Sequence, residues 1–425
     1  MRRNLLLGLL VVALLAFSVS TLFAGAQREA AEREIVLTWP SIWVGQDSKA
    51  DVMEEIVNEF NQQHAGRIRV VVEPQPDYDG YEDTIRTRLA ARRPPDIFTF
   101  KLSPTTAVYY SGDLLMDFSA DLGRDGWGDT FNQGNLNAST MGGATKSLPY
   151  EIGFTPIWYN TELFARAGID RFPQTMDEFW EACEKLKAIG VVPTSQMTGG
   201  TNSWTSMLWY THFLGSYGGP DVWERAWDDR AFEQAAAIIK RLYSDGNTTR
   251  DAIGADAGVS SGHYMNERTA MFINGAWFIG RIRDDAPDVY RATELAPAPK
   301  AGNYHGHQVG WLHTNLAAAH TDDPARREAV VTFMRHLTSP ENAKRVSLAA
   351  GSLLAVEFEL GPQDQLDPLQ AKFIEAGNQA EFLIDHMEAS MPVDVVYELG
   401  QALGSMVLED RSPREFVQML QAAEN

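Results

Sequence analysis

Apolar positions that follow the N-terminal segment switch between two periods over about seventy residues. Short runs rich in β-branched residues predict strands over residues 34–39, 67–73 and 96–100. Between them, apolar side chains recur every four residues over 52–60 and 81–89, which is the spacing of one helix face. This βαβαβ order predicts an open α/β sheet whose strands pair in parallel through right-handed crossovers.

Ligands of such sheets bind beyond the carboxyl ends of the strands. Trp39, Tyr78 and the segment 100–103 follow the three predicted strands. We therefore expect these positions near a binding site, and this expectation depends on strand order alone.

The chain changes character after a Gly-, Asn- and Thr-rich stretch at residues 132–146. The following region is largely helical and contains several tryptophans, with strands expected over 155–159 and 309–319. Helices are expected over residues 161–167, 176–189, 203–214, 232–243 and 276–283, and from Asp323-Pro324 onward.

Residues 1–26 predict a cleaved secretory signal peptide. Arg2 and Arg3 precede an apolar run from Leu5 to Phe17, and Ala24-Gly25-Ala26 supplies a small-x-small cleavage pattern. The run is shorter than the roughly 20 residues of a spanning helix, so a membrane anchor is the less favoured interpretation. A lipoprotein would carry a cysteine just after this run, whereas the only cysteine is Cys183. We expect a soluble, exported mature protein.

The composition is acidic. Lys and Arg total 36 and Asp and Glu total 57, which gives a net charge of −21 over 425 residues. Such a charge repels nucleic acid, anionic lipid surfaces and polyanionic ligands. A single cysteine excludes an intramolecular disulfide framework. Cys183 shares a predicted helix face with Phe179 and Leu186, so we expect it in a core and not as a nucleophile.

Sequence motifs for catalysis or metal binding are absent or poorly formed. There is no G-x-S-x-G elbow, and acidic neighbours such as Glu54-Glu55 point in different directions on a helix, unlike a glycosidase pair. Residues 77–80 resemble a calcium loop only superficially, because the glycine comes too early. His305, His307 and His313 lack flanking acidic or Cys ligands. We expect no cofactor, no metal and no catalytic residue.

Several motifs, each weak alone, occur together in the order and spacing of one protein family. They are Phe60-Asn61, Pro95-Asp96-Ile97, residues 158–164 (WYNTELF), residues 172–179 (FPQTMDEF) and residues 270–277 (AMFINGAW). With them the chain resembles the family-1 extracellular solute-binding proteins of ABC importers, the group that includes maltose-binding protein. The resemblance implies a two-lobed periplasmic-binding-protein fold, with two discontinuous α/β lobes joined by a hinge. By analogy, residues 30–149 and 294–345 form the N-terminal lobe, and residues 150–293 and 346–425 form the C-terminal lobe.

The resemblance also implies a sugar site, which needs aromatic platforms beside hydrogen-bonding groups. Trp277 matches a position that stacks on the ligand in sugar-binding relatives, after a Gly275 that would free the backbone; core packing is the alternative for Trp277. The other candidates are Trp39 and Trp43, for which core packing is also open, and Tyr78, Phe100, Ser103, Glu151, Trp204 and Trp311. Maltose-binding protein has an acidic partner where this chain has Ser103, which puts maltodextrin specificity in doubt.

These observations favour a non-enzymatic, monomeric binding protein that captures a carbohydrate and delivers it to the permease subunits of an ABC importer. A polyol, an opine-like compound or a polyamine is the alternative ligand, and a secreted carbohydrate-active enzyme is the less favoured alternative function. Because a binding protein without a lipid anchor must be retained by an outer barrier, we expect it in the periplasm.

Overall fold

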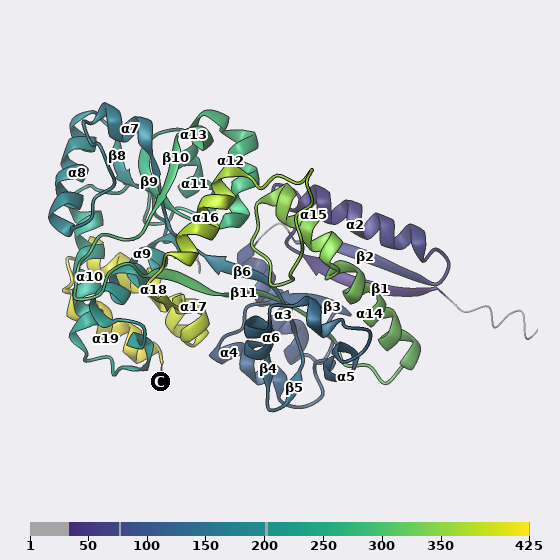
Figure 1. Ribbon diagram of the computed structural model, residues 1–425. Helices are drawn as coiled ribbons and strands as arrows, with labels where there is room; N and C mark the ends of the chain where they lie inside the picture. The colour runs from purple at the N-terminus through teal and green to yellow at the C-terminus, as the bar shows by residue number, and fades with distance from the viewer. Residues whose placement is uncertain (1–33, 76–77, 200–202, 425) are drawn as a thin grey trace, which may run out of the picture.

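The computed structural model describes residues 34–75, 78–199 and 203–424. The predicted signal peptide, residues 1–26, lies outside these ranges. Within them, no helix is both long enough and apolar enough to cross a membrane. Figure 1 shows two lobes, and the strands β6 (Leu148–Phe154) and β11 (Gln308–Ala318) run from one to the other. The two-lobed α/β fold expected from the sequence is confirmed.

The first lobe begins with the predicted βαβαβ order. Its elements are β1 (Ile35–Ser41), α2 (Ala50–Gln63), β2 (Ile68–Pro74), α3 (Tyr78–Ala90) and β3 (Ile97–Phe100). Strands β1 and β2 pair in parallel, as predicted. Helix α2 forms because one face is apolar: its buried residues recur at helical spacing and pack under the sheet.

The prediction that β3 also pairs in parallel is wrong. Strand β3 pairs antiparallel with β11, with Phe100 opposite Asn315. The Thr38 backbone N–H of β1 donates instead to the Asp96 carboxylate at 2.8 Å, and the Thr38 hydroxyl donates to the same oxygen. A side chain therefore occupies the edge where a third parallel strand would bond, and Arg326 pairs with the second Asp96 oxygen.

Short elements complete the first lobe. They are α4 (Pro104–Ala107), α5 (Ser119–Leu122), α6 (Gln133–Ala138), β4 (Thr140–Met141), β5 (Ala144–Thr145), α14 (Pro324–Leu337) and α15 (Pro340–Ala350). Helices α14 and α15 come after the chain has crossed to the second lobe and returned, and both pack beside α2 (Figure 1).

The second lobe contains a four-stranded sheet covered by helices. The sheet order is β10-β7-β9-β8, and only the β8–β9 pair is parallel. Its strands are β7 (Ile157–Asn160), β8 (Val192–Thr194), β9 (Thr269–Ile273) and β10 (Thr293–Ala296), and β12 (Leu383–Ile384) adds to β11. Its helices are α7 (Thr161–Arg166), α8 (Met176–Ala188), α9 (Trp204–Gly218), α10 (Arg230–Ser244), α11 (Ala257–Met265), α12 (Ile279–Asp285), α13 (Pro287–Ala292), α16 (Pro368–Asn378), α17 (Met387–Ser390), α18 (Val393–Leu408) and α19 (Pro413–Ala423).

The buried cores bear on where the lobes divide. One core includes residues from Leu37 to Tyr150 and from Leu316 to Val356, while Val309 and Trp311 belong to the large core of the second lobe. The change from one core to the other therefore falls within β11. The lobe limits given above stay a prediction, and this packing favours a return crossing inside β11 over one near residue 294.

Cys183 lies in the large apolar core of the second lobe. Its side chain is fully buried among the apolar residues of the second lobe. Burial raises the pKa of the Cys183 thiol to about 12, so the thiol stays protonated at neutral pH. The expectation of a structural, unreactive cysteine is consistent with this placement.

Candidate ligand-binding site

A cavity of about 680 Å³ lies where the two lobes meet. Its wall combines indole rings with charged and amide groups, the mixture that orients a polar ligand on an apolar surface. The first lobe contributes Trp43, Asp47, Lys49 and Lys101; the second contributes Met197, Trp204, Ala257, Asn274 and Trp277; Glu151 and His313 come from the crossing strands β6 and β11.

The aromatic part of the wall is centred on Trp277, which directly follows β9. The Trp277 ring stacks on His313 with centroids 4.4 Å apart and an interplanar angle of 12°. Trp204 at the start of α9 packs against it at 5.6 Å, and Trp311 lies behind both rings. Each indole holds its neighbours in place, so the surface that faces the cavity is rigid.

Gly275 makes room for this ring. Its φ of −93° is open to any residue, so the expectation that the glycine frees the backbone is wrong. The reason for glycine is space: a Cβ built there would lie 2.2 Å from the Trp277 ring.

We expect Gly275→Ala to displace the Trp277 ring and weaken ligand affinity by about tenfold, the effect of ~1.4 kcal/mol. Titration calorimetry with a sugar that binds measures the affinity, and intrinsic tryptophan fluorescence reports the displacement of the Trp277 ring. Gly404→Ala is the matched control, because Gly404 lies inside α18 with open space around its Cβ position. That control should stabilise the fold by ~0.5–1 kcal/mol and leave affinity unchanged; an unaltered Trp277 environment in Gly275→Ala would contradict the steric argument.

The charged part of the wall is a buried lysine held by two carboxylates. Lys49 Nζ lies 3.3 Å from Glu151 Oε1 and 3.4 Å from Asp47 Oδ1, and the Lys49 and Glu151 side chains are each only 2% exposed. Burial alone would lower the pKa of Lys49, but the two carboxylates outweigh it and raise that pKa. Burial raises the pKa of Glu151 against the opposing effect of Lys49.

A second cavity, of about 860 Å³, adjoins the first through a shared residue, Lys101. Lys101 Nζ lies 2.9 Å from Glu388 Oε2 on α17 and 3.1 Å from Glu82 Oε1 on α3, so this ion pair joins the lobes. Tyr109 from the first lobe and Tyr397 from α18 stand on opposite walls of the second cavity.

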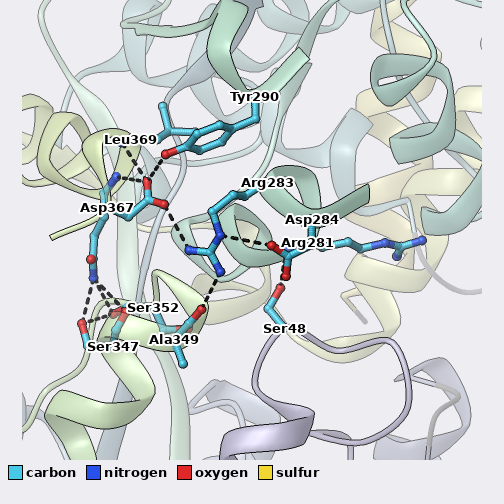
Figure 2. A network of polar contacts seen from close by, with 11 residues as sticks. Ser48, Arg281, Arg283, Asp284, Tyr290, Ser347, Ala349, Ser352, Asp367 and Leu369 are labelled. Carbon is cyan, nitrogen blue, oxygen red and sulfur yellow. Dashed lines mark hydrogen bonds and ion pairs between the residues drawn. The ribbon is translucent and has the colours of Figure 1, made fainter. Parts of the chain in front are cut away.

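Polar contacts also tie the lobes together at α12 (Figure 2). The Arg281 backbone N–H donates to Ser48 Oγ at 3.0 Å, which fixes the loop that carries Asp47 and Lys49. Arg283 donates to the Ala349 carbonyl oxygen at 3.0 Å and to the Asp367 carboxylate at 3.2 Å. Because α12 follows Trp277 within two residues, both walls of the first cavity are held by one element.

The structure brings four of the predicted site residues to the first cavity. They are Trp43, Glu151, Trp204 and Trp277. Phe100 and Ser103 line the second cavity, where Ser103 also caps α4.

Two other predicted residues, Trp39 and Trp311, are not in the described lining of either cavity. Trp39 is 1% exposed and Trp311 is 5% exposed, and both pack behind the wall tryptophans. Tyr78 begins α3, and its side chain lies outside the part of the structure that is described. For Trp39, the placement agrees with the core alternative.

Four polar lining residues had not been proposed as site residues: Asp47, Lys49, Asn274 and His313. A fifth, Lys101, lies in the segment 100–103 that strand order placed near a binding site. Sequence signals exist for two of the four: Asn274 precedes the Gly275-Ala276-Trp277 turn, and His313 shares a strand face with Trp311 at a spacing of two. Within the described ranges, no group of three or more His, Cys, Asp and Glu side chains could hold a metal ion.

Comparison with known proteins identifies the family to which this sequence is similar. A family model described as bacterial extracellular solute-binding protein matches residues 46–344. A multiple sugar-binding protein of Streptococcus mutans is 26% identical over 235 residues, which cover 53% of this chain and 54% of the relative. The diacetylchitobiose binding protein DasA of Streptomyces coelicolor is 26% identical over 153 residues, covering 35% of this chain and 33% of the relative. The matches thus span about a third to about a half of the length of these curated relatives.

Solved structures match over nearly the whole chain. A chitin oligosaccharide binding protein superposes with a TM-score of 0.85 at 22% identity, covering 92% of this chain and 98% of that one. Maltose-bound MalE3 of T. maritima gives a TM-score of 0.76 at 18% identity, with 92% and 99% covered. At these identities the similarity establishes the fold.

Proposed function

This chain belongs to the bacterial extracellular solute-binding proteins, and from that premise we propose that it captures a carbohydrate between its lobes and delivers it to the permease subunits of an ABC importer. Relatives named for sugar binding support the ligand class. Closure of the lobes over the ligand would create the form that the importer recognises.

One observation carries this proposal: the same cavity is lined by tryptophan rings and by hydrogen-bonding groups. Trp277 and Trp204 offer flat apolar faces, which suit the C–H face of a pyranose. Glu151 and Asp47 offer acceptors, and Lys49 and Asn274 offer donors, for hydroxyl groups at the ring edge.

The same geometry argues for binding without chemistry. The two carboxylates of the first cavity, Asp47 and Glu151, both face the same lysine, and Lys49 Nζ fills the space between them. A glycosidase needs its two carboxyl groups on either side of the scissile bond, with one free to deliver a proton. The curated relatives quoted above are likewise named as binding proteins.

The family places the protein outside the cytoplasm, and we propose the periplasm as its compartment. The signal pattern over residues 1–26 and the lack of a cysteine after the apolar run support this. We also propose a monomer as the working form.

The direct test is a thermal-shift screen of the mature protein against neutral sugars, polyols, opine-like compounds and polyamines. A ligand at a hundredfold excess over its Kd should add about 2.7 kcal/mol to stability. Mass analysis of the sugar after incubation tests the enzyme alternative. A response to polyols or amines with none to sugars would overturn the carbohydrate proposal, and release of altered sugar would overturn the binding-only proposal.

We expect Trp277→Ala to weaken sugar affinity at least tenfold, because it removes the central platform; Trp277→Phe should recover part of the loss. The measurement is titration calorimetry. Trp180→Ala is the matched control, since Trp180 is a partly exposed indole on α8 that packs against Arg241, and it is not among the lining residues. Full affinity in Trp277→Ala would remove Trp277 from the binding site.

A further inference from the structure

The two lysines of the cleft share an unusual arrangement: each is bound by two carboxylates. Lys49 faces Asp47 and Glu151, with the distances given above. Lys101 faces Glu82 at 3.1 Å and Glu388 at 2.9 Å. The one arginine among the lining residues of these two cavities, Arg86, pairs in turn with Asp83.

These pairings leave the cleft with more negative than positive charge. Each lysine neutralises one of its two carboxylates, so each of the two clusters has a surplus of one negative charge when both of its carboxylates are ionised. Glu388 holds its charge firmly: burial would raise its pKa, but Lys101 and His386 outweigh burial and hold that pKa far below its usual range. The whole chain, at −21, adds a field of the same sign.

This charge balance disfavours sugars that carry a negative group and favours sugars that carry a positive group. A phosphate or carboxylate group needs a cation that is not already matched, such as an arginine fork or an open helix N-terminus. The two lysines of this cleft already face two carboxylates each and Arg86 pairs with Asp83, so an acidic sugar would add a further negative group. An ammonium group would instead supply the missing positive charge.

Two further features favour an ammonium group. Trp43, Trp204 and Trp277 line the first cavity, and indole rings attract cations, as the position of Lys49 Nζ 5.9 Å from the Trp43 ring centroid illustrates. His313 also lines this cavity, and burial, assisted by Lys101 and Lys49, holds the pKa of His313 well below its usual value, so its neutral ring adds no positive charge that would repel an ammonium group.

We infer that the first cavity selects a sugar that carries a cationic amino group over its neutral parent, and rejects sugars that carry a carboxylate or phosphate. This inference rests on the proposed function and names the ligand class within it. The amino group would lie near Asp47 and Glu151, with the sugar ring on Trp277.

The test compares matched sugars at pH 6.5, where the amino group carries its proton. Calorimetry is run on neutral hexoses, their 2-amino derivatives and the corresponding uronic acids in the gluco, galacto and manno series, as monosaccharides and as β-1,4-linked disaccharides. In the series that binds, the amino sugar should bind about tenfold more tightly than its neutral parent, and the uronic acid should bind at least tenfold more weakly. A neutral parent that binds as tightly as the amino sugar, or a uronic acid that binds within fivefold of the parent, would overturn the inference while leaving the proposed function in place. Binding of polyols or polyamines with no response from any sugar would overturn the proposed function itself.

Charge-neutral variants assign the preference to named groups. Asp47→Asn, at a position that is 23% exposed and tolerant of change, should cut the preference for the amino sugar to about threefold or less. Glu151→Gln should act in the same direction where it folds. Glu294→Gln removes a carboxylate that pairs with Lys372 outside both cavities and should leave the ratio unchanged. An unchanged ratio in Asp47→Asn and Glu151→Gln would contradict the inference.

Discussion

Replacing Lys49 with methionine should lower the free energy of unfolding by about 3–5 kcal/mol, because it leaves a buried carboxylate without its cation. Lys49 and Glu151 have 2% exposed side chains, so water cannot replace the lost partner. The burial that raises the pKa of Glu151 would then act unopposed by the lysine. Urea unfolding of wild type and variant at pH 7.5 measures the difference.

The sign of the pH dependence gives an internal check. A carboxyl group whose folded-state pKa is raised contributes stability below its unfolded value and loses it as pH rises through the folded value. Lys49→Met should therefore be most destabilised at high pH and recover as the solution is acidified towards pH 5. A destabilisation that does not depend on pH would contradict a charge-based cause.

Two controls test whether the loss of stability comes from leaving a buried charge unpaired and not from the loss of any ion pair. The double variant Lys49→Met with Glu151→Gln removes both charges and should recover most of the lost stability. Arg69→Met breaks a pair with Glu34 at a position that is 53% exposed. It should cost no more than about 1 kcal/mol, as exposed ion pairs do.

The local pattern of apolar residues was enough to predict most helices and strands. It failed to predict strand pairing where a segment distant in sequence bonded to the edge of a strand. The periods of apolar residues gave β1, α2, β2 and α3 within a few residues. The pairing of β3 depended on Asp96, whose carboxylate takes the Thr38 backbone N–H, and on β11, which arrives from more than two hundred residues later. Neither contact can be recognised from the alternation of apolar and polar residues within β3 itself.

For the site, the aromatic candidates were easier to predict than the charged ones. Trp43, Trp204 and Trp277 are large apolar residues in loops or at helix starts, and resemblance pointed to the positions of Trp43 and Trp277. Lys49 lies in a loop just before α2, where a charged residue is normally solvated, but it is 2% exposed and contacts Glu151, which lies more than a hundred residues later in the chain. A buried charge is a property of the assembled cleft, so its sequence neighbours do not reveal it.

Acid should destabilise this protein well before its carboxylates are protonated. Four buried histidines, His212, His307, His313 and His386, all have their pKa lowered, chiefly by burial, and that of His212 is lowered to about 3. Their lowered pKa values mean that they bind fewer protons in the fold than in the unfolded chain, which takes up protons below pH ~6.5. Well below pH 6.5, each histidine whose pKa is lowered in the fold reduces the free energy of unfolding by about 1.4 kcal/mol per pH unit.

With all four neutral in the folded state, stability should fall by at most about 4 kcal/mol between pH 6.5 and pH 5.5, because the unfolded histidines are already half protonated at pH 6.5, and it should hold steady between pH 7.5 and pH 8.5. The sign follows from proton counting: below pH ~6.5 the unfolded chain binds more protons, so acid favours unfolding. Urea unfolding at these four pH values gives the proton uptake from the slope. His212→Gln removes one such group and should reduce the uptake by about one proton, whereas His320→Gln, at a 41% exposed side chain, should leave it unchanged. Equal stability at pH 6.5 and pH 5.5 would mean that these histidines take up protons in the folded protein as readily as in the unfolded chain, which would contradict the lowering of their pKa values by burial.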